Sequence, residues 1–100
     1  MEKKSTILRK ILEKGEFHFI IYVGTAHQAQ LAEKVGFKVV GVSGSNTSTQ
    51  ILGLPDAGFL TLTELVENVD RICRAVNLPV NVDCDTGFGN AINVRRTVDA

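Results

Sequence analysis

Three apolar runs alternate with amphipathic stretches along this chain, and that alternation restricts the fold more than any other feature of the sequence. The runs cover residues 17–23, 38–42 and 80–84. Leucine, isoleucine and valine recur at helical spacing before and between them, which predicts helices at about residues 5–14, 26–35 and 61–75. A further helical pattern covers residues 90–100, and residues 47–53 predict a short helix or an irregular segment. Strands that alternate with helices pair in parallel through right-handed crossovers, so the predicted fold class is α/β, with three parallel strands and flanking helices.

The third run leads directly into an acidic, glycine-rich turn. Alternation along an extended strand would place Asp83 and Asp85 on the same face. Two carboxylates there repel each other, and a hard divalent cation such as Mg²⁺ relieves the repulsion because it prefers oxygen ligands. Gly87 and Gly89 allow the backbone to turn tightly beside the charged site. The alternative is a strand end with solvated aspartates, which are common in turns.

Two other segments are candidates for the same site. Ser43, Gly44 and Ser45 follow the second run at once, and such small residues allow backbone N–H groups to point at an anion. The alternative is a plain polar loop. Asp56 lies in a Leu-Pro-Asp turn and is a third carboxylate that the fold could bring near the first two. Its alternative role is to form the turn or to cap a helix.

Length, charge and cysteine content exclude several classes of function. The chain has 100 residues, which suits one small domain, and its formal net charge is zero. A neutral chain gives no electrostatic reason to expect a nucleic-acid or acidic-membrane partner, and no apolar run approaches the roughly 20 residues of a membrane span. Cys73 and Cys84 fall in unlike patterns, one helical and one extended. That pairing does not suggest a disulfide scaffold, and we expect a reducing, cytoplasmic location.

Five short segments, in order and at characteristic spacing, resemble the isocitrate lyase and phosphoenolpyruvate mutase superfamily. They are LAEKVGF (31–37), VSG (42–44), LGLPD (52–56), LTLTE (60–64) and VDCDTGFGN (82–90). The resemblance extends from about Leu8 to Ala100 and is greatest to the short members, among them 2-methylisocitrate lyase, 2,3-dimethylmalate lyase, oxaloacetate decarboxylase and carboxyphosphonoenolpyruvate phosphonomutase.

The resemblance implies a fold, an activity and an assembly. It implies the N-terminal portion of a (β/α)8 TIM barrel, with residues 1–100 as a single partial domain truncated after the third β/α unit. It also implies a Mg²⁺-dependent carbon–carbon lyase that acts on a 2-hydroxy or 2-oxo di- or tricarboxylate through a pyruvate-like enolate. Family members are homo-oligomers, usually tetramers and sometimes dimers, so we expect a small carboxylate substrate and a second copy of the chain as partners.

By motif match, the resemblance assigns roles to the candidate residues. Asp83 would hold Mg²⁺ most directly, and Asp85 and Asp56 would bind its waters or complete the site. The loop residues would bind the substrate carboxylate and oxyanion; they are Ser43, Gly44 and Ser45.

The chain departs from the family pattern at several positions. Many members carry an aromatic residue followed by aspartate after the first strand, where this chain has Gly24-Thr25, and often an aromatic residue where it has Gly41. The Lys-Lys-Cys-Gly-His loop with the acid/base cysteine of the lyases has no counterpart, and Cys84 would lie on the opposite strand face from the aspartates. We therefore expect no turnover by these 100 residues alone. The alternatives are a phosphonate-forming mutase and a non-catalytic barrel fragment that self-associates.

Overall fold

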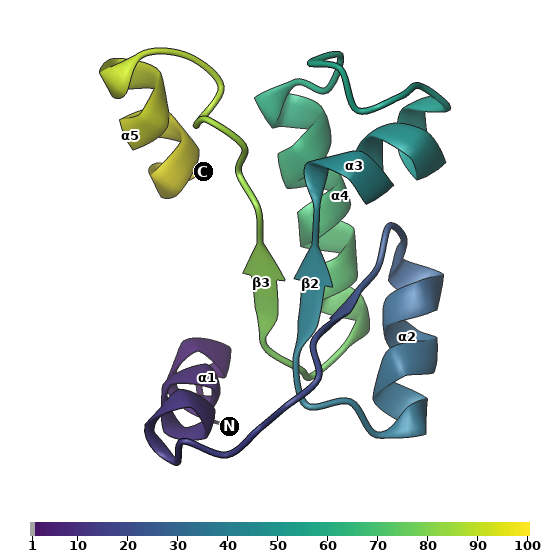
Figure 1. Cartoon of the computed structure of the whole chain (residues 1–100), viewed down its shortest axis with the longest axis vertical. Helices are drawn as coiled ribbons and strands as arrows, with labels where there is room; N and C mark the ends of the chain where they lie inside the picture. The colour runs from purple at the N-terminus through teal and green to yellow at the C-terminus, as the bar shows by residue number, and fades with distance from the viewer. Residues whose placement is uncertain (1) are drawn as a thin grey trace.

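The computed structural model describes residues 2–100 and contains one sheet of three parallel strands (Figure 1). The strands are β1 (Ile21–Tyr22), β2 (Val40–Val42) and β3 (Val80–Val82), in that spatial order. The arrows of β2 and β3 point to the end of the molecule where α3 lies (Figure 1). The predicted parallel α/β architecture is confirmed, and β1 and β3 are the two edges of the sheet.

The strands are shorter than the sequence predicted. The first run was expected to be a strand over residues 17–23, but only Ile21–Tyr22 forms one. The side chains of Phe17 and Phe19 are 80% and 72% exposed and pack edge-on against each other. The ladder between β1 and β2 begins at the pair of Ile21 and Val40, so residues 17–20 lie outside it. Because β1 is an edge strand, these residues have no other strand beside them either. The other two strands also lose their ends, since residues 38–39 and 83–84 lie outside the ladder.

The helices form where the apolar periodicity predicted them, except that helical structure already begins at Gly44, where no helix was expected. They are α1 (Lys4–Glu13), α2 (Ala26–Val35), α3 (Gly44–Thr47), the π-helix η1 (Ser48–Leu52), α4 (Leu62–Ala75) and α5 (Ala91–Asp99). Thr25 caps α2 by accepting a hydrogen bond from the N–H of Gln28, and Thr61 and Glu64 form the expected capping box of α4. Gly36 ends α2 with φ of 114°, a left-handed conformation that favours glycine.

The core lies between the sheet and the pair α2 and α4, which pack against each other. Val40 and Val42 of β2 are fully buried there, and Leu65 and Ile72 cover them from α4. Burying one such aliphatic side chain contributes about 1.5–3 kcal/mol, so this layer fixes the position of β2 and of the residues that follow it. One polar side chain, Asn68, lies in the same helix face and is 3% exposed.

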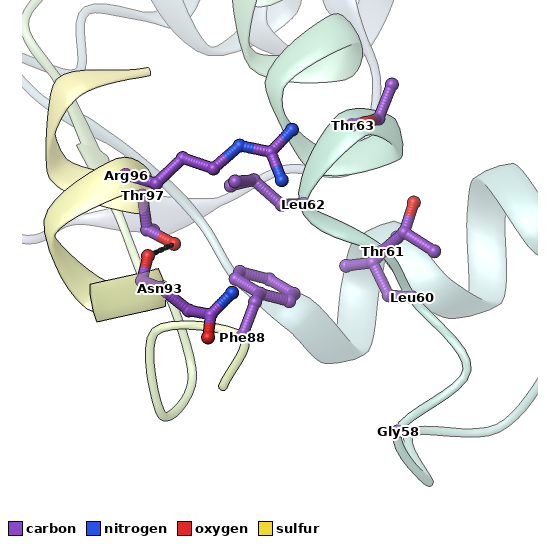
Figure 2. A pocket seen from close by; sticks show the side chains of 9 residues that line it. All are labelled: Gly58, Leu60, Thr61, Leu62, Thr63, Phe88, Asn93, Arg96 and Thr97. Carbon is purple, nitrogen blue, oxygen red and sulfur yellow. Dashed lines mark hydrogen bonds between the residues drawn. The ribbon is translucent and has the colours of Figure 1, made fainter. Parts of the chain in front are cut away.

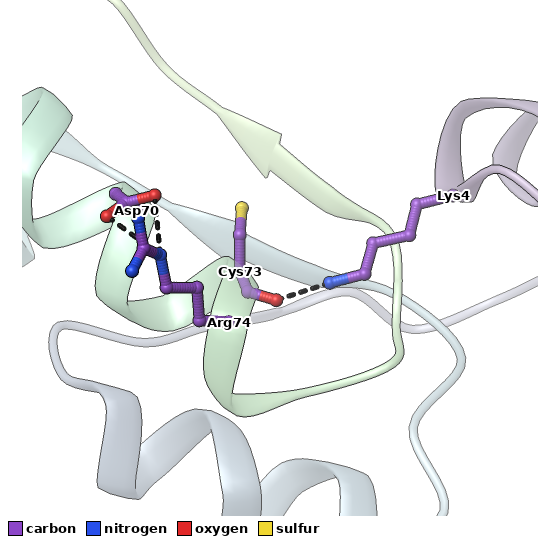
Figure 3. Close-up of polar contacts among 4 residues, drawn as sticks. All are labelled: Lys4, Asp70, Cys73 and Arg74. Carbon is purple, nitrogen blue, oxygen red and sulfur yellow. Dashed lines mark hydrogen bonds and ion pairs between the residues drawn. The ribbon is translucent and has the colours of Figure 1, made fainter.

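A lysine of helix α1 binds the C-terminal end of α4. The Nζ of Lys4 donates hydrogen bonds to the carbonyl oxygens of Cys73 (2.5 Å) and Val76 (2.6 Å) at the C-terminal end of α4 (Figure 3). A cation is favourable there because the last carbonyls of a helix carry partial negative charge. Within residues 2–100 no helix has both the length and the apolar character needed to cross a membrane.

Candidate active site

The strand ends form a row of three residues, Gly24, Ser43 and Asp83, which we call the tip row. The last ladder pairs before it are Tyr22 with Gly41 and Val42 with Val82. Backbone N–H groups continue the pairing beyond the strands: Val23 donates to the carbonyl of Gly41 (2.8 Å) and Asp83 to that of Val42 (2.9 Å). Extending the register therefore aligns the tip row across the sheet, with about 4.8 Å between neighbouring strands.

The tip row lies on the face of the sheet opposite to the core formed with α2 and α4. Successive strand residues point to opposite faces, and Val40 and Val42 point into the helical core. Gly41 therefore faces the other way, and an ideal Cβ atom placed on it would lie 2.7–3.1 Å from ring atoms of Tyr22. The aromatic ring thus covers Gly41 from the neighbouring strand, and Ser43 follows on the same face.

Asp83 and Asp85 do not lie on one face of a strand, contrary to the prediction from alternation. Both follow β3, and Asp85 has φ of 48°, which is left-handed and not extended. The reason is a local turn in which the N–H of Asp85 donates to Oδ1 of Asp83 (2.9 Å). The turn directs the carboxylate of Asp85 to Gly44, where an ideal Cβ atom would lie 2.9 Å from both of its oxygens. A larger residue at position 44 would displace the carboxylate of Asp85 from this place.

Three negative charges influence one another at this end of the sheet. Burial raises the pKa of Asp85 above its usual value, and the carboxylates of Asp83 and then Asp56 raise it further. Within residues 2–100 the ion pairs join Lys10 with Glu2, His18 with Glu16 and Arg74 with Asp70, and none involves these aspartates. The carboxylates are therefore neighbours without a basic side chain to neutralise them.

The donor set suits Mg²⁺, although it is not a closed metal centre. Among residues 2–100, no three histidine, cysteine, aspartate or glutamate side chains gather closely enough to enclose a metal ion. Mg²⁺ does not need such a cage, because it is commonly held by one or two carboxylates and keeps several waters. Oxygen donors without a cationic partner fit that chemistry. The metal-binding roles of Asp83 and Asp85 remain predictions.

Ser43, Gly44 and Ser45 form the start of a helix and not an irregular loop. The Oγ of Ser43 accepts a hydrogen bond from the N–H of Asn46 (3.1 Å) and caps α3. The first intrahelical bond is donated by the N–H of Thr47 to the carbonyl of Ser43 (3.1 Å). The N–H groups of Gly44 and Ser45 precede that bond and are available to an acceptor beside Asp85.

The π-helix η1 ties the third aspartate to this region. The Oγ of Ser48 donates to the carbonyl oxygens of Leu54 (3.1 Å) and Pro55 (3.0 Å), which directly precede Asp56. Ser48 is 1% exposed, so the contact fixes the turn from inside the molecule. Asp56 itself is exposed at the surface of that turn.

Helix α5 holds the segment that carries Asp83 and Asp85. The buried Thr97 donates from Oγ1 to the carbonyl of Gly87 (2.7 Å). Next to this contact lies a cleft of about 420 Å³ between the start of α4 and α5, and Leu62 of α4, Arg96 of α5 and Phe88 are among its lining residues (Figure 2). The segment is therefore anchored at its far end as well as at β3.

Cys84 is separated from the carboxylates that flank it in sequence. It lines an apolar groove of about 330 Å³ along α4, together with residues such as Val66 and Val69. Burial raises the pKa of its thiol, and the negative charges of Asp83 and Asp85 raise it further. Its place in the groove agrees with the expectation that Cys84 lies on the opposite face from the aspartates.

Comparison with known proteins decides the family. The model of the phosphoenolpyruvate phosphomutase family matches residues 8–100. The chain belongs to this family. It is 43% identical over 96 residues to isocitrate lyase of Haloferax volcanii, 55% over 69 residues to oxaloacetate decarboxylase of Rhodopseudomonas palustris, and 43% over 98 residues to 2-methylisocitrate lyase of Aeropyrum pernix. These alignments cover 96%, 69% and 98% of the chain, but only 28%, 24% and 32% of the respective relatives.

Solved structures of the phosphoenolpyruvate phosphomutase family superimpose on nearly the whole chain. Oxaloacetate acetylhydrolase with the inhibitor 3,3-difluorooxalacetate gives a TM-score of 0.88 at 31% identity, over 96% of this chain and 33% of that one. Phosphonopyruvate hydrolase with oxalate and Mg²⁺ gives 0.85 at 34%, over 97% and 34%. A 2,3-dimethylmalate lyase of the same superfamily gives 0.86 at 30%, over 98% and 36%. The three β/α units thus correspond to about a third of these TIM-barrel enzymes.

Three residues at the strand tips escaped the sequence analysis. Tyr22 covers Gly41, Gln50 covers Gly24, and Asn68 binds the carbonyl of Gly24 through Nδ2 (2.9 Å). A polar residue in the apolar stripe of α4 was the available signal for Asn68. No local pattern marks the other two, because their partners lie in distant parts of the sequence.

Proposed function

We propose that residues 1–100 supply the Mg²⁺-binding and carboxylate-binding part of a lyase that cleaves a carbon–carbon bond. The substrate class is a 2-hydroxy or 2-oxo di- or tricarboxylate, cleaved through a pyruvate-like enolate. The observation that carries the proposal is the approach of the Asp85 carboxylate to Gly44 at the start of α3, with Asp83 and Asp56 as charged neighbours. An acidic metal site and free backbone donors then adjoin at the ends of parallel strands, where barrel active sites are found.

Each group has a defined task in this proposal. The N–H groups of Gly44 and Ser45 bind the substrate carboxylate and the oxygen on which negative charge develops, and Ser43 holds them in place by capping α3. Asp83 holds Mg²⁺ most directly, and Asp85 and Asp56 bind its waters or complete the site. When bound, Mg²⁺ supplies Lewis-acid stabilisation of charge on the substrate oxygen.

The acid/base group comes from outside these 100 residues. General acid–base catalysis contributes typically 10²–10⁴-fold, and Cys84 is turned to the apolar groove with its thiol pKa raised by burial. We therefore propose that a polypeptide of residues 1–100 alone has no lyase turnover and contributes binding only.

A phosphonate-forming mutase is the second candidate, because the matching family model is that of phosphoenolpyruvate phosphomutase and a phosphonopyruvate hydrolase superimposes on the chain. The same donors would bind the carboxylate of phosphonopyruvate. The two candidates differ in the bond that breaks, carbon–carbon in one and carbon–phosphorus in the other.

Assembly into homo-oligomers in the cytoplasm is part of the proposal. Both sheet edges are unpaired within residues 2–100, and large apolar side chains lie open along the β1 edge and on α5. Phe17 and Ile92 are each 80% exposed. Open edges and apolar patches of this kind favour association.

Turnover by the full gene product tests the proposal. Oxaloacetate, 2-methylisocitrate and 2,3-dimethylmalate are supplied in turn with Mg²⁺, and pyruvate is measured by a coupled assay, while ³¹P NMR follows phosphonopyruvate. We expect Mg²⁺-dependent pyruvate release that Asp85→Asn lowers and Asp99→Asn, an exposed aspartate on α5, leaves unchanged. Loss of phosphonopyruvate without release of pyruvate from the other substrates would favour the mutase. Turnover that persists in EDTA would refute both.

A further inference from the structure

Gln50 occupies the side-chain space of Gly24 at one end of the tip row. An ideal Cβ atom at Gly24 would lie 2.6–2.9 Å from the carboxamide atoms of Gln50. Gly24 follows Tyr22 by two residues, so that space opens on the face opposite to α2 and α4, which also carries Ser43 and Asp83. The amide therefore lies at the end of the row opposite to Asp83.

Gly24 is a fixed point and not an adaptable loop residue. Its N–H donates to Oε1 of Gln28 (2.8 Å), and its carbonyl accepts from the buried Asn68 (2.9 Å). The segment that carries Gln50 is also held, because the buried Ser48 anchors η1 to the following turn. A single-turn π-helix is an uncommon feature that often marks functional sites. Rigid backbones on both sides thus hold the carboxamide of Gln50, an exposed residue, against Gly24.

We propose that Gln50 is a specificity-determining residue that binds the distal polar group of the substrate, and that Gly24 is the residue that admits it. This inference rests on the proposed function. Ser43 is one strand spacing from Gly24 and Asp83 is two, about 10 Å in all, so a substrate whose first carboxylate lies at Gly44 extends its far end to the amide. A carboxamide donates through Nε2 to a second carboxylate and accepts through Oε1 from a hydroxyl group. The ligand class is a dicarboxylate or hydroxy acid with a polar group remote from the reacting carboxylate.

Two ligands of different length distinguish a contact with Gln50 from contacts with the rest of the site. Oxalate has no distal arm, whereas 3,3-difluorooxaloacetate carries a second carboxylate beyond the oxo group. Calorimetry on the full gene product with Mg²⁺ gives the affinity for each. We expect Gln50→Ala to weaken 3,3-difluorooxaloacetate roughly 10- to 100-fold, the effect of losing one hydrogen bond to a charged group, and to leave oxalate within about twofold.

Gly24→Ala tests the same inference from the other side. The added methyl group displaces only the end of a flexible side chain, so the backbone remains in place while the amide moves. We expect the same selective loss in Gly24→Ala, and no additional loss when it is combined with Gln50→Ala, because the two changes act through one group. Gln30→Ala, an exposed glutamine on α2, is the matched control and retains both affinities.

The outcomes distinguish the two levels of the proposal. If Gln50→Ala binds oxalate and 3,3-difluorooxaloacetate with the wild-type affinities, the role of Gln50 is refuted and the proposed function is not. An equal loss for both ligands also refutes the role of Gln50, since it indicates a general defect of the site. If the wild-type protein binds neither ligand with Mg²⁺, the proposed function fails and the role of Gln50 fails with it.

Discussion

Replacing Asn68 tests whether the strand end that carries Gly24 is fixed from the helical core. Asn68 is 3% exposed and donates from Nδ2 to the carbonyl of Gly24, 44 positions earlier in the sequence, at 2.9 Å. Gly24 is itself buried, so its carbonyl has no access to solvent in place of this donor. Asn68→Ala leaves the acceptor unpaired, which costs about 1–3 kcal/mol.

That magnitude can be measured by unfolding. For a domain of about 100 residues, 1 kcal/mol changes the thermal midpoint by about 4–8 °C, so a loss near 2 kcal/mol lowers it by roughly 10 °C. Circular dichroism during urea and thermal unfolding gives both quantities. The control is Asn77→Ala, because the side chain of Asn77 is exposed after α4 and only its backbone N–H is bonded, to Glu33.

Asn68→Asp sharpens the test because it keeps the size of the side chain. The carboxylate would face a carbonyl oxygen, which raises its pKa in the folded state. The loss of stability in Asn68→Asp is therefore absent at pH values below the pKa of the new carboxyl group in the unfolded state. It appears as the pH rises through the pKa of that group in the folded state. A loss in Asn68→Ala below about 0.5 kcal/mol, or no pH dependence in Asn68→Asp, would refute the account of this contact.

Three further predictions concern charge, a helix end and a glycine. The pKa of Asp85 is raised by burial and by Asp83 and Asp56, so without Mg²⁺ we expect the stability of the wild-type protein to fall as the pH rises through that pKa. Asp85→Asn removes this dependence and raises the midpoint of thermal unfolding at neutral pH. An unchanged pH profile in this variant would contradict the prediction. Lys4→Met loses the hydrogen bonds to the C-terminal end of α4, which costs about 1 kcal/mol of stability. Arg74→Met costs less, because the exposed ion pair of Arg74 with Asp70 contributes about 0.3–0.5 kcal/mol (Figure 3). Gly87→Ala costs about 1–3 kcal/mol in urea unfolding, because φ is +89° and the new Cβ atom would lie 3.1 Å from Cα of Val94. Gly15→Ala is the milder control, because φ is +68° there but the space around it is open. Equal losses in the two variants would refute the steric explanation.

Periodicity predicted the helices and the parallel sheet because burial of an apolar stripe is decided locally and repeats along the chain. Thr61 and Glu64, for example, formed the capping box expected from their spacing. The ends of the strands were not predictable in this way. Whether Phe17 lies in a ladder depends on a neighbour strand, and β1 has only one.

The candidate site shows the same division. Residues 43–45 and 83–85 were expected to meet at one end of the sheet, and they do so because the strands that precede them are parallel. The turn at Asp85 and the cap at Ser43 are set by side-chain hydrogen bonds that compete with extended backbone, which alternation ignores. The contacts of Gln50 with Gly24 and of Tyr22 with Gly41 join distant segments, so they required the folded chain.

Titration calorimetry of the full gene product with Mg²⁺, in the presence of oxalate, tests most directly whether the strand-tip aspartates form one metal site with the start of α3. We predict saturable binding that Asp83→Asn abolishes, that Asp85→Asn weakens roughly 10- to 100-fold as loss of a supporting group does, and that the exposed Asp99→Asn retains. Binding of Mg²⁺ by Asp83→Asn with the wild-type affinity would contradict the account.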